Sequence, residues 1–211
     1  VFMTTGRILN IPNILTLARI ALIPVFLLVA YWPPVMGIAE QAVSMSRHIL
    51  LTSIFVVAAV TDWFDGYLAR TLNQTSAFGR FLDPVADKLM VAAALIVLVQ
   101  WKPEISMAFA AIVIISREIT VSALREWMAQ LGEHKSVAVA YVGKLKTAAQ
   151  MIAVLLLLFD APLVAGVNTR LLGNIFMVLA AVLTLWSMGY YLKMAAIQMR
   201  TQKNQDEVLD R

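Results

Sequence analysis

The sequence contains no cysteine among its 211 residues, which excludes disulfide bonds and thiolate chemistry. It has only two histidines, His48 and His134, and we assign them no chemistry because neither has a partner at metal-ligand spacing. Charged residues make up only 14% of the chain, below the share usual in a soluble domain. Internal repeats, low-complexity tracts and interdomain linkers are also missing. We therefore expect a single domain over residues 1–211.

Apolar side chains are abundant, at 61% of the residues with a mean hydropathy of +0.79. These values are typical of an integral membrane protein. Uncharged apolar segments recur six times and predict an all-α fold with six transmembrane helices. We expect the segment 3–12 to lie along the membrane interface, and the polar segment 198–211 to be a helix end or a frayed tail. The apolar segments are residues 20–39, 49–61, 89–101, 105–116, 147–159 and 171–192.

Four of these segments have only 12 or 13 residues, although a helix needs about 20 to cross the hydrocarbon. Their helices must carry charges inward, which predicts a polar cavity at one membrane face. If six spans place both termini on one side, 14 of the 17 Lys and Arg residues fall on that side. The positive-inside rule then makes the cavity face the cytoplasm. The net charge of +4 indicates contact with anionic lipid rather than with nucleic acid.

Four aspartates interrupt the apolar sequence in the stretch TDWFDGYLARTLNQTSAFGRFLDPVADK. Asp62 and Asp65 are three positions apart and Asp83 and Asp87 are four apart, so each pair shares a helix face. One membrane aspartate alone can be a helix cap, a salt-bridge partner or a proton site. Four converging carboxylates would repel one another unless cations or protons compensated them. Oxygen ligands without nearby His or Cys favour Mg²⁺ or Mn²⁺.

Small residues and an arginine accompany the aspartates. Gly66 and Ala69 leave a shallow groove where a flat group could approach the backbone, and Arg70 offers planar donors suited to phosphate oxygens. Gly79 lies one turn before the second aspartate pair. We place Pro84 near the start of the second helix, where proline is tolerated.

In chain order these eight residues form the pattern D-x2-D-G-x2-A-R-x8-G-x3-D-x3-D, which resembles the signature of the CDP-alcohol phosphotransferases at every fixed position. The resemblance implies a six-helix integral membrane enzyme, commonly a homodimer, that uses a divalent metal to transfer a phosphatidyl or alcohol-phosphate group with release of CMP. It implies a metal site made by Asp62, Asp65, Asp83 and Asp87. Asp87 would also serve as the general base. It also implies a nucleotide site made by Gly66, Ala69, Gly79 and Arg70, in which Arg70 would contact the diphosphate.

Three cations suit a phosphate on the acceptor. The stretch SREITVSALREW places Arg117 and Glu118 where an apolar segment reaches the cytoplasmic side, and YVGKLKTAAQ places Lys144 and Lys146 at the start of the next. They predict a site for a phosphorylated acceptor, in which Glu118 orients Arg117. The alternative is that these cations are ordinary positive-inside anchors that reach lipid headgroups. Arg117 fits that alternative least well, because it abuts a 12-residue apolar segment.

The amino-terminal stretch NIPNILTLARI, together with these two, is similar to the bacterial phosphatidylglycerophosphate synthases of the same family. That similarity implies CDP-diacylglycerol and sn-glycerol 3-phosphate as substrates, and a place in the bacterial inner membrane. Asn10, Asn13, Thr16 and Arg19 follow one another at three-residue spacing and predict a polar stripe. We expect Asn13 and Thr16 to line the CDP-diacylglycerol side of the cavity. The alternatives are helix capping by Asn13 and lipid contact by Arg19.

Other functions remain open on the sequence alone. A related transferase could use inositol phosphate or serine as its acceptor. An intramembrane prenyltransferase also uses paired aspartates, but such folds need more helices and leave the Gly-Ala-Arg arrangement unexplained. A cation-coupled transporter also uses buried carboxylates, but alternating access would want a midplane site and inverted repeats.

Overall fold

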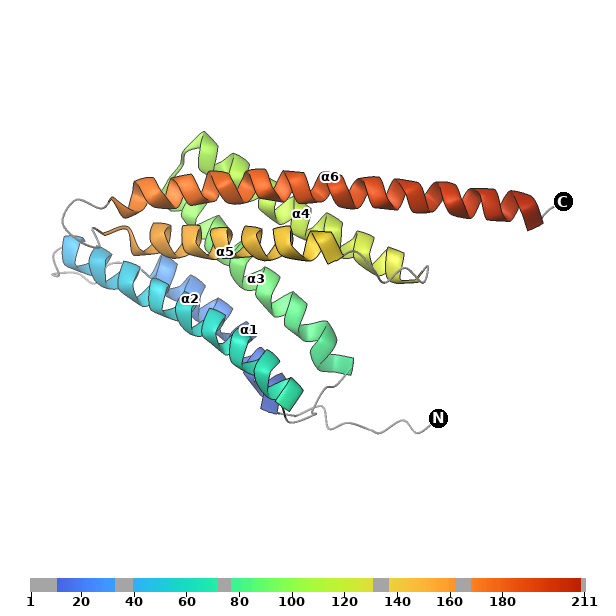
Figure 1. Ribbon diagram of the computed structural model, residues 1–211. Helices are drawn as coiled ribbons and strands as arrows, with labels where there is room; N and C mark the ends of the chain where they lie inside the picture. The colour runs from blue at the N-terminus through green and yellow to red at the C-terminus, as the bar shows by residue number, and fades with distance from the viewer. Residues whose placement is uncertain (1–10, 33–39, 72–76, 131–136, 162–167, 210–211) are drawn as a thin grey trace. The chain divides into compact units, whose positions relative to one another are not determined.

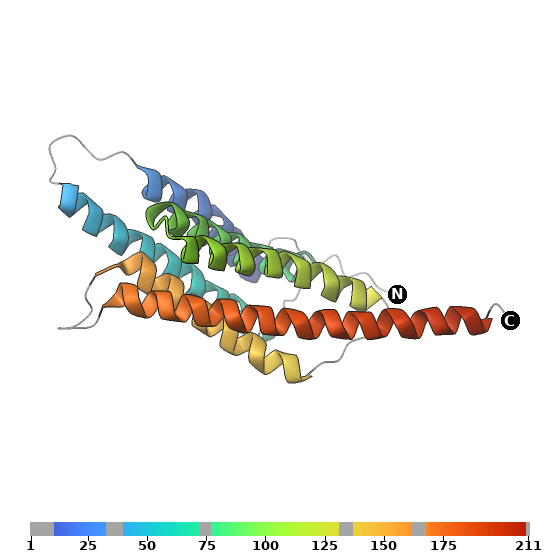
Figure 2. The ribbon, with the colours of Figure 1, turned by 90° about the horizontal axis from the view of Figure 1, so that it is seen from above.

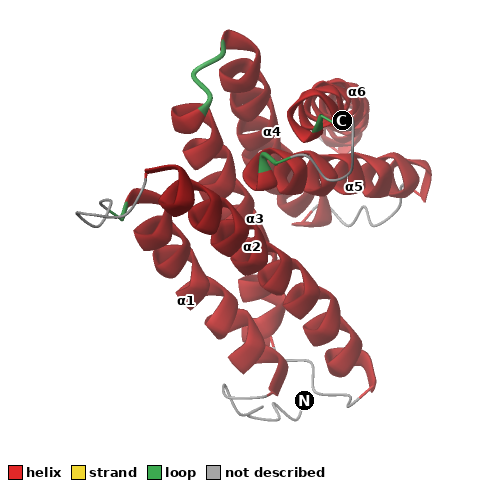
Figure 3. Cartoon of the chain, turned by 90° about the vertical axis from the view of Figure 1, so that its left-hand side faces the viewer, coloured by secondary structure: helices red, strands yellow, loops and turns green. Residues whose placement is uncertain are grey.

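The computed structural model describes residues 11–32, 40–71, 77–130, 137–161 and 168–209 (Figure 1). Within those ranges the chain forms helices and no strand, as expected for an all-α protein (Figure 3). Most of the interfacial segment predicted for residues 3–12 lies outside the described residues. The helices are α1 (Ile11–Tyr31), α2 (Glu40–Thr71), α3 (Ala77–Trp101), α4 (Ile105–Gln130), α5 (Val137–Phe159) and α6 (Thr169–Leu209).

Helices α2 to α6 extend beyond the uncharged segments and include charged residues at their ends. That these charges lie inside the membrane stays a prediction. Among the described residues, four stretches are long and apolar enough to cross a membrane, and Leu145–Phe159 is a shorter apolar helix. That α3 and α5 also cross, giving six spans, stays a prediction. The four stretches are Asn13–Tyr31, Met45–Asp62, Ile105–Met128 and Thr169–Ile197.

The helices group into two compact units. The first unit comprises Val1–Pro103 and Val154–Leu171, and the second comprises Glu104–Ala153 and Leu172–Arg211. The interpretation of residues 1–211 as a single domain stays a prediction.

In the first unit, α1 packs against both α2 and α3. Phe26 and Ala30 of α1, Phe55 and Ala58 of α2 and Ala86 of α3 are buried. Small side chains such as these alanines let membrane helices approach closely, where packing rather than water exclusion holds them together. The three helices that carry the aspartates and the polar stripe therefore belong to one packed group.

A polar cluster joins the end of α3 to the residues after α5, also in the first unit. Lys102 is buried and its Nζ lies 2.8 Å from Asp160 Oδ1. His48 Nδ1 lies 2.7 Å from the carbonyl oxygen of Leu158, and the His48 ring meets Trp101 edge to face. The contacts of His48 are thus structural, in line with its having been assigned no chemistry.

The second unit contains α4, residues 137–153 of α5 and most of α6. Its buried side chains include Ala110 and Ile114 of α4, Ala153 of α5 and Met177 and Ala180 of α6. Helix α6 runs for 41 residues without interruption (Figure 2). The polar segment from residue 198 is therefore helical through residue 209, which is the helix-end alternative.

The prediction that Pro84 lies near a helix start is wrong. Helix α3 begins at Ala77, so Pro84 is two turns inside it. Proline has no N–H, so the backbone carbonyl of Arg80, four residues earlier, loses its helical partner. Membrane helices tolerate such a break because neighbouring helices and side chains can supply another partner for the freed carbonyl.

Candidate active site

The polar stripe on α1 is buried. The side chains of Asn13, Thr16 and Arg19 are at most 2% exposed, whereas Ile14, Leu17 and Val25 on other faces of the same helix are exposed. Three-residue spacing brings polar side chains to one helical face, as the sequence predicted. An exposed apolar face is what a lipid-facing helix presents.

Two residues of this stripe contact three of the four aspartates. Thr16 Oγ1 donates a hydrogen bond to Asp83 Oδ1 of α3. Arg19 Nη1 lies 2.9 Å from Asp62 Oδ1 of α2, and the same nitrogen forms an ion pair with Asp87 of α3. We call Asp62, Asp83 and Asp87 the acidic centre. Asp62 of α2 and Asp83 and Asp87 of α3 thus lie against the same buried face of α1.

The alternative that Arg19 contacts lipid is wrong. Its side chain is only 1% exposed, while those of Asp62 and Asp87 are 44% and 45% exposed. A buried guanidinium needs a partner, because leaving its charge unpaired away from water is costly. The carboxylates supply that partner and still present oxygen atoms to the outside.

The acidic centre has the donor chemistry of a magnesium or manganese site. Carboxylate oxygens without nitrogen or sulfur ligands are what hard divalent cations prefer. Among the described residues, however, no group of three or more acidic or histidine side chains is arranged to hold an ion directly. A physical reason is that Arg19 Nη1 contacts both Asp62 and Asp87.

The remaining residues of the signature are placed only by their backbone. Asp65, Gly66, Ala69 and Arg70 lie on the last turns of α2, and their side chains are outside the described residues. Gly79 is buried in the first turn of α3. The roles assigned to these five residues stay predictions.

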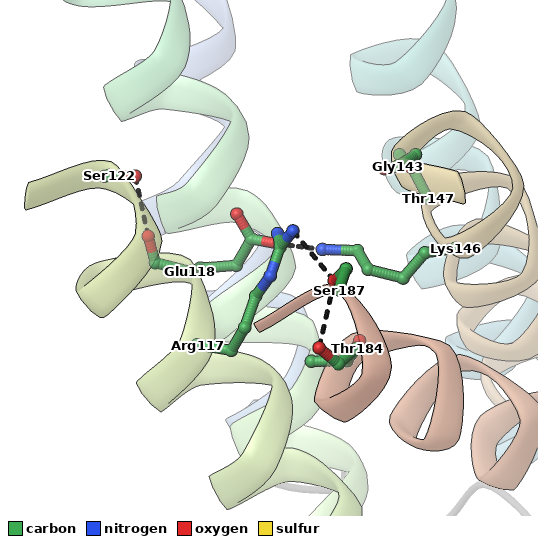
Figure 4. Close-up of polar contacts among 8 residues, drawn as sticks. All are labelled: Arg117, Glu118, Ser122, Gly143, Lys146, Thr147, Thr184 and Ser187. Atoms are coloured by element: carbon green, nitrogen blue, oxygen red, sulfur yellow. Dashed lines mark hydrogen bonds and ion pairs between the residues drawn. The ribbon is translucent and has the colours of Figure 1, made fainter. Parts of the chain in front are cut away.

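The second unit contains a separate cluster, made by Arg117, Glu118, Lys146 and Ser187, which we call the cationic cluster (Figure 4). Arg117 Nη1 donates to Glu118 Oε1 at 3.0 Å, and Lys146 forms an ion pair with the same oxygen. Arg117 Nη2 donates to Ser187 Oγ of α6 at 3.1 Å. Three helices thus meet around one carboxylate.

Both cations of the cluster are buried, with Arg117 4% and Lys146 2% exposed. The alternative that Lys146 is a lipid-headgroup anchor is therefore wrong. Glu118 contacts Arg117 as predicted. Lys144 lies on α5, but its side chain is outside the described residues.

The cluster also has unused hydrogen-bonding capacity. Arg117 Nε and Thr184 Oγ1 are buried and have no hydrogen-bond partner among the described residues. Ser187, whose hydroxyl also donates to the Thr184 carbonyl, is absent from the sequence-based site. Its signal is weak, since a lone serine in an apolar helix commonly bonds its own backbone.

Residues 9–186 match the sequence model of the CDP-alcohol phosphatidyltransferases. The chain belongs to this family. The matched range includes the whole acidic centre and three of the four residues of the cationic cluster, and it ends one residue before Ser187.

Curated relatives in the CDP-alcohol phosphatidyltransferase family align over nearly their full length. A protein of Pectobacterium atrosepticum is 49% identical over 187 residues, covering 88% of this chain and 94% of the relative. Proteins of Shigella flexneri serotype 5b and Escherichia coli K12 are each 46% identical over 193 residues, covering 92% of this chain and 98% of the relative. All three carry the name CDP-diacylglycerol–glycerol-3-phosphate 3-phosphatidyltransferase.

Proposed function

We propose that this protein transfers the phosphatidyl group of CDP-diacylglycerol to sn-glycerol 3-phosphate, producing phosphatidylglycerol phosphate and CMP. The observation that carries the proposal is the convergence of Asp62, Asp83 and Asp87 on the buried face of α1. The names of relatives at 46–49% identity support the choice of substrates.

The acidic centre is the proposed site of the nucleotide diphosphate. Asp62, Asp83 and Asp87, with Asp65, would hold Mg²⁺ or Mn²⁺, which would neutralise the diphosphate and the departing CMP. Asp87 would accept the proton of the attacking acceptor hydroxyl as the new O–P bond forms and the bond to CMP breaks. Its half-exposed side chain supports this role.

Asn13, Thr16, Gly66, Ala69, Arg70 and Gly79 are the proposed contacts of CDP-diacylglycerol. Of these, Asn13 and Thr16 lie on the stripe that meets the acidic centre. Helix α1 also presents apolar side chains outward, such as Leu17 and Leu28, which suits a substrate that stays in the lipid.

The cationic cluster is the proposed site of the acceptor phosphate, bound by Arg117, Lys144 and Lys146. The support is physical: Arg117 has an Nε–H without a partner among the described residues, and it is held in place from α6 by Ser187. A guanidinium fixed in this way can donate to phosphate oxygens with little loss of conformational freedom. Glycerol phosphate carries a phosphate that serine lacks, and this group distinguishes the two acceptors.

We also propose a location and an assembly. The bias of Lys and Arg toward the side of the termini supports a site that faces the cytoplasm, and the bacterial relatives support the inner membrane. The homodimer follows from the family resemblance.

The first prediction tests this reaction directly. Purified protein in detergent, given CDP-diacylglycerol, Mg²⁺ and radiolabelled sn-glycerol 3-phosphate, should release CMP and move the label into the lipid phase. Asp87→Asn should lower the rate by about 10² to 10⁴, the usual contribution of a general base. The measurement is the initial rate of labelled-lipid formation.

Three results would contradict the proposal. If the label stays in the aqueous phase and the Asp87→Asn rate equals the parent rate, the protein does not catalyse this transfer. Release of inorganic diphosphate from an added prenyl diphosphate, with no CMP formed from CDP-diacylglycerol, would indicate a prenyltransferase. Serine or inositol phosphate accepted in preference to glycerol phosphate would change the acceptor.

A further inference from the structure

Arg19 occupies an unusual position for a cation in a membrane helix. Its guanidinium is almost fully buried on α1, and its Nη1 contacts carboxylates from two other helices, Asp62 of α2 and Asp87 of α3. A buried arginine costs free energy unless acidic partners compensate its charge. Arg19 is buried directly at the acidic centre, so its position there calls for an explanation.

The ion pairs are unequal in exposure. The arginine is 1% exposed, whereas each carboxylate is nearly half exposed. A dissolved cation can therefore reach the carboxylates from outside, while Arg19 is confined behind them. Arg19 and an incoming ion would share the same acidic partners.

The negative charges of the acidic centre explain why a fixed cation is useful beside them. Carboxylates brought within a few ångströms by α2 and α3 repel one another, and the repulsion is weakly screened away from water. Arg19 compensates this repulsion at all times, because arginine stays protonated in proteins. Thr16, one turn earlier on α1, holds Asp83 by a hydrogen bond but adds no charge.

We propose that Arg19 is the internal counter-ion of the acidic centre, a positioning residue that keeps Asp62 and Asp87 together while no divalent ion is bound. The proposal rests on the metal-binding role given above to the same aspartates. It goes beyond that role because it assigns a residue outside the aspartate signature. When a divalent ion is bound, the carboxylates have a second compensating cation and depend less on Arg19.

The first experiment measures thermal unfolding of the full-length protein in detergent, with EDTA and with saturating Mg²⁺. With EDTA, Arg19→Met should melt about 2–5 °C below the parent, because two half-exposed carboxylates then repel each other without their counter-ion. With Mg²⁺ most of this loss should be recovered. The gain in melting temperature from Mg²⁺ should therefore be larger in Arg19→Met than in the parent.

Two variants serve as matched controls. Arg19→Lys keeps the charge and should keep the parent's small response to Mg²⁺. Thr16→Val removes a hydrogen bond of the same stripe without changing charge, so it should lower both melting temperatures equally. An equal loss with EDTA and with Mg²⁺ in Arg19→Met would reduce Arg19 to a packing residue and overturn the proposal.

A second experiment does not depend on metal binding. With EDTA, the double variant Arg19→Met with Asp87→Asn should melt at or above Arg19→Met alone, because one of the two repelling charges is gone. If Arg19→Met fails to fold, the double variant should restore a folded protein. Additive losses would overturn the counter-ion role. If Mg²⁺ does not change the melting temperature of the parent, but the double variant still melts at or above Arg19→Met, the result would contradict the metal site and leave the counter-ion role intact.

Discussion

Arg117 divides its guanidinium between two helices. One terminal nitrogen donates to Glu118 beside it on α4, and the other donates to Ser187 on α6. The third nitrogen, Nε, has no partner among the described residues. The serine therefore fixes the plane of the guanidinium, and this plane decides where an acceptor phosphate would bind.

Ser187→Ala should weaken acceptor binding without harming the chemistry. Ser187 does not itself bind the acceptor, so we expect its hydrogen bond to contribute about 1–1.4 kcal/mol, which corresponds to about a five- to tenfold rise in KM for glycerol 3-phosphate. We expect kcat and the KM for CDP-diacylglycerol to change less than twofold. Steady-state kinetics with each substrate varied in turn measures all three.

Ser122→Ala is the matched control for this prediction. Ser122 is a half-buried serine of α4, and its hydroxyl donates to the Glu118 backbone carbonyl of its own helix. Its removal should leave both KM values near the parent values. An equal effect of the two substitutions would mean that the Ser187 contact has no special part in acceptor binding.

Single residues differ in how far the sequence predicts them. The aspartate pairs, Arg117 and Lys146 could be chosen because residue type and local spacing carry the signal. The partners of Arg19 are 43 and 68 residues away along the chain. Helical spacing gives the face on which a residue lies, but not the element that packs against that face. The sequence therefore left lipid contact open for Arg19 and did not predict its ion pairs.

At the scale of helices, the connection after α5 is held by charge and by backbone shape. Asp160 has φ +44°, a left-handed conformation that only a few residue types adopt easily, and its carboxylate pairs with buried Lys102 at the end of α3. Asparagine tolerates the same backbone conformation, whereas alanine does not. Two substitutions can therefore separate the two contributions.

Asp160→Asn should lower the free energy of unfolding by about 1–3 kcal/mol, because it leaves buried Lys102 without its carboxylate. Asp160→Ala should cost about 1 kcal/mol more, because it adds backbone strain. Thermal unfolding in detergent measures both losses. A melting temperature of Asp160→Asn equal to that of the parent would mean that the ion pair does not stabilise this connection.

Helices were more predictable in number than in extent. Where the structure describes them, the apolar segments lie almost entirely in helices, because a chain in lipid must satisfy its backbone internally. Their ends were missed where polar residues continue the helix, as in α2, α4 and α6. Pro84 was misplaced for a related reason: proline disfavours the helix interior in water, but α3 carries it two turns from its start.

For the whole molecule, membrane topology depends on whether α3 crosses the bilayer. Thr71 ends α2 and Pro103 follows α3, and both are exposed. If α3 crosses, these two positions lie on opposite sides of the membrane. The absence of cysteine makes this easy to test, because any introduced cysteine is the only one present.

We expect Pro103→Cys to react with a membrane-impermeant maleimide in cells whose outer membrane has been opened and whose inner membrane is intact. We expect Thr71→Cys to react only after the inner membrane is opened, since its end of α2 is on the Lys- and Arg-rich side. Labelling is read from gel mobility. If both positions react from the same side, α3 does not span the membrane and the six-span topology is wrong.

The length of α6 sets how far the protein extends beyond the lipid. Its 41 residues measure about 60 Å at 1.5 Å per residue, roughly twice the thickness of the hydrocarbon. The candidate span ends at Ile197, and the helix continues to Leu209. A small soluble protein fused in helical register at that point would be carried at a fixed angle, giving electron microscopy a visible landmark outside the detergent micelle.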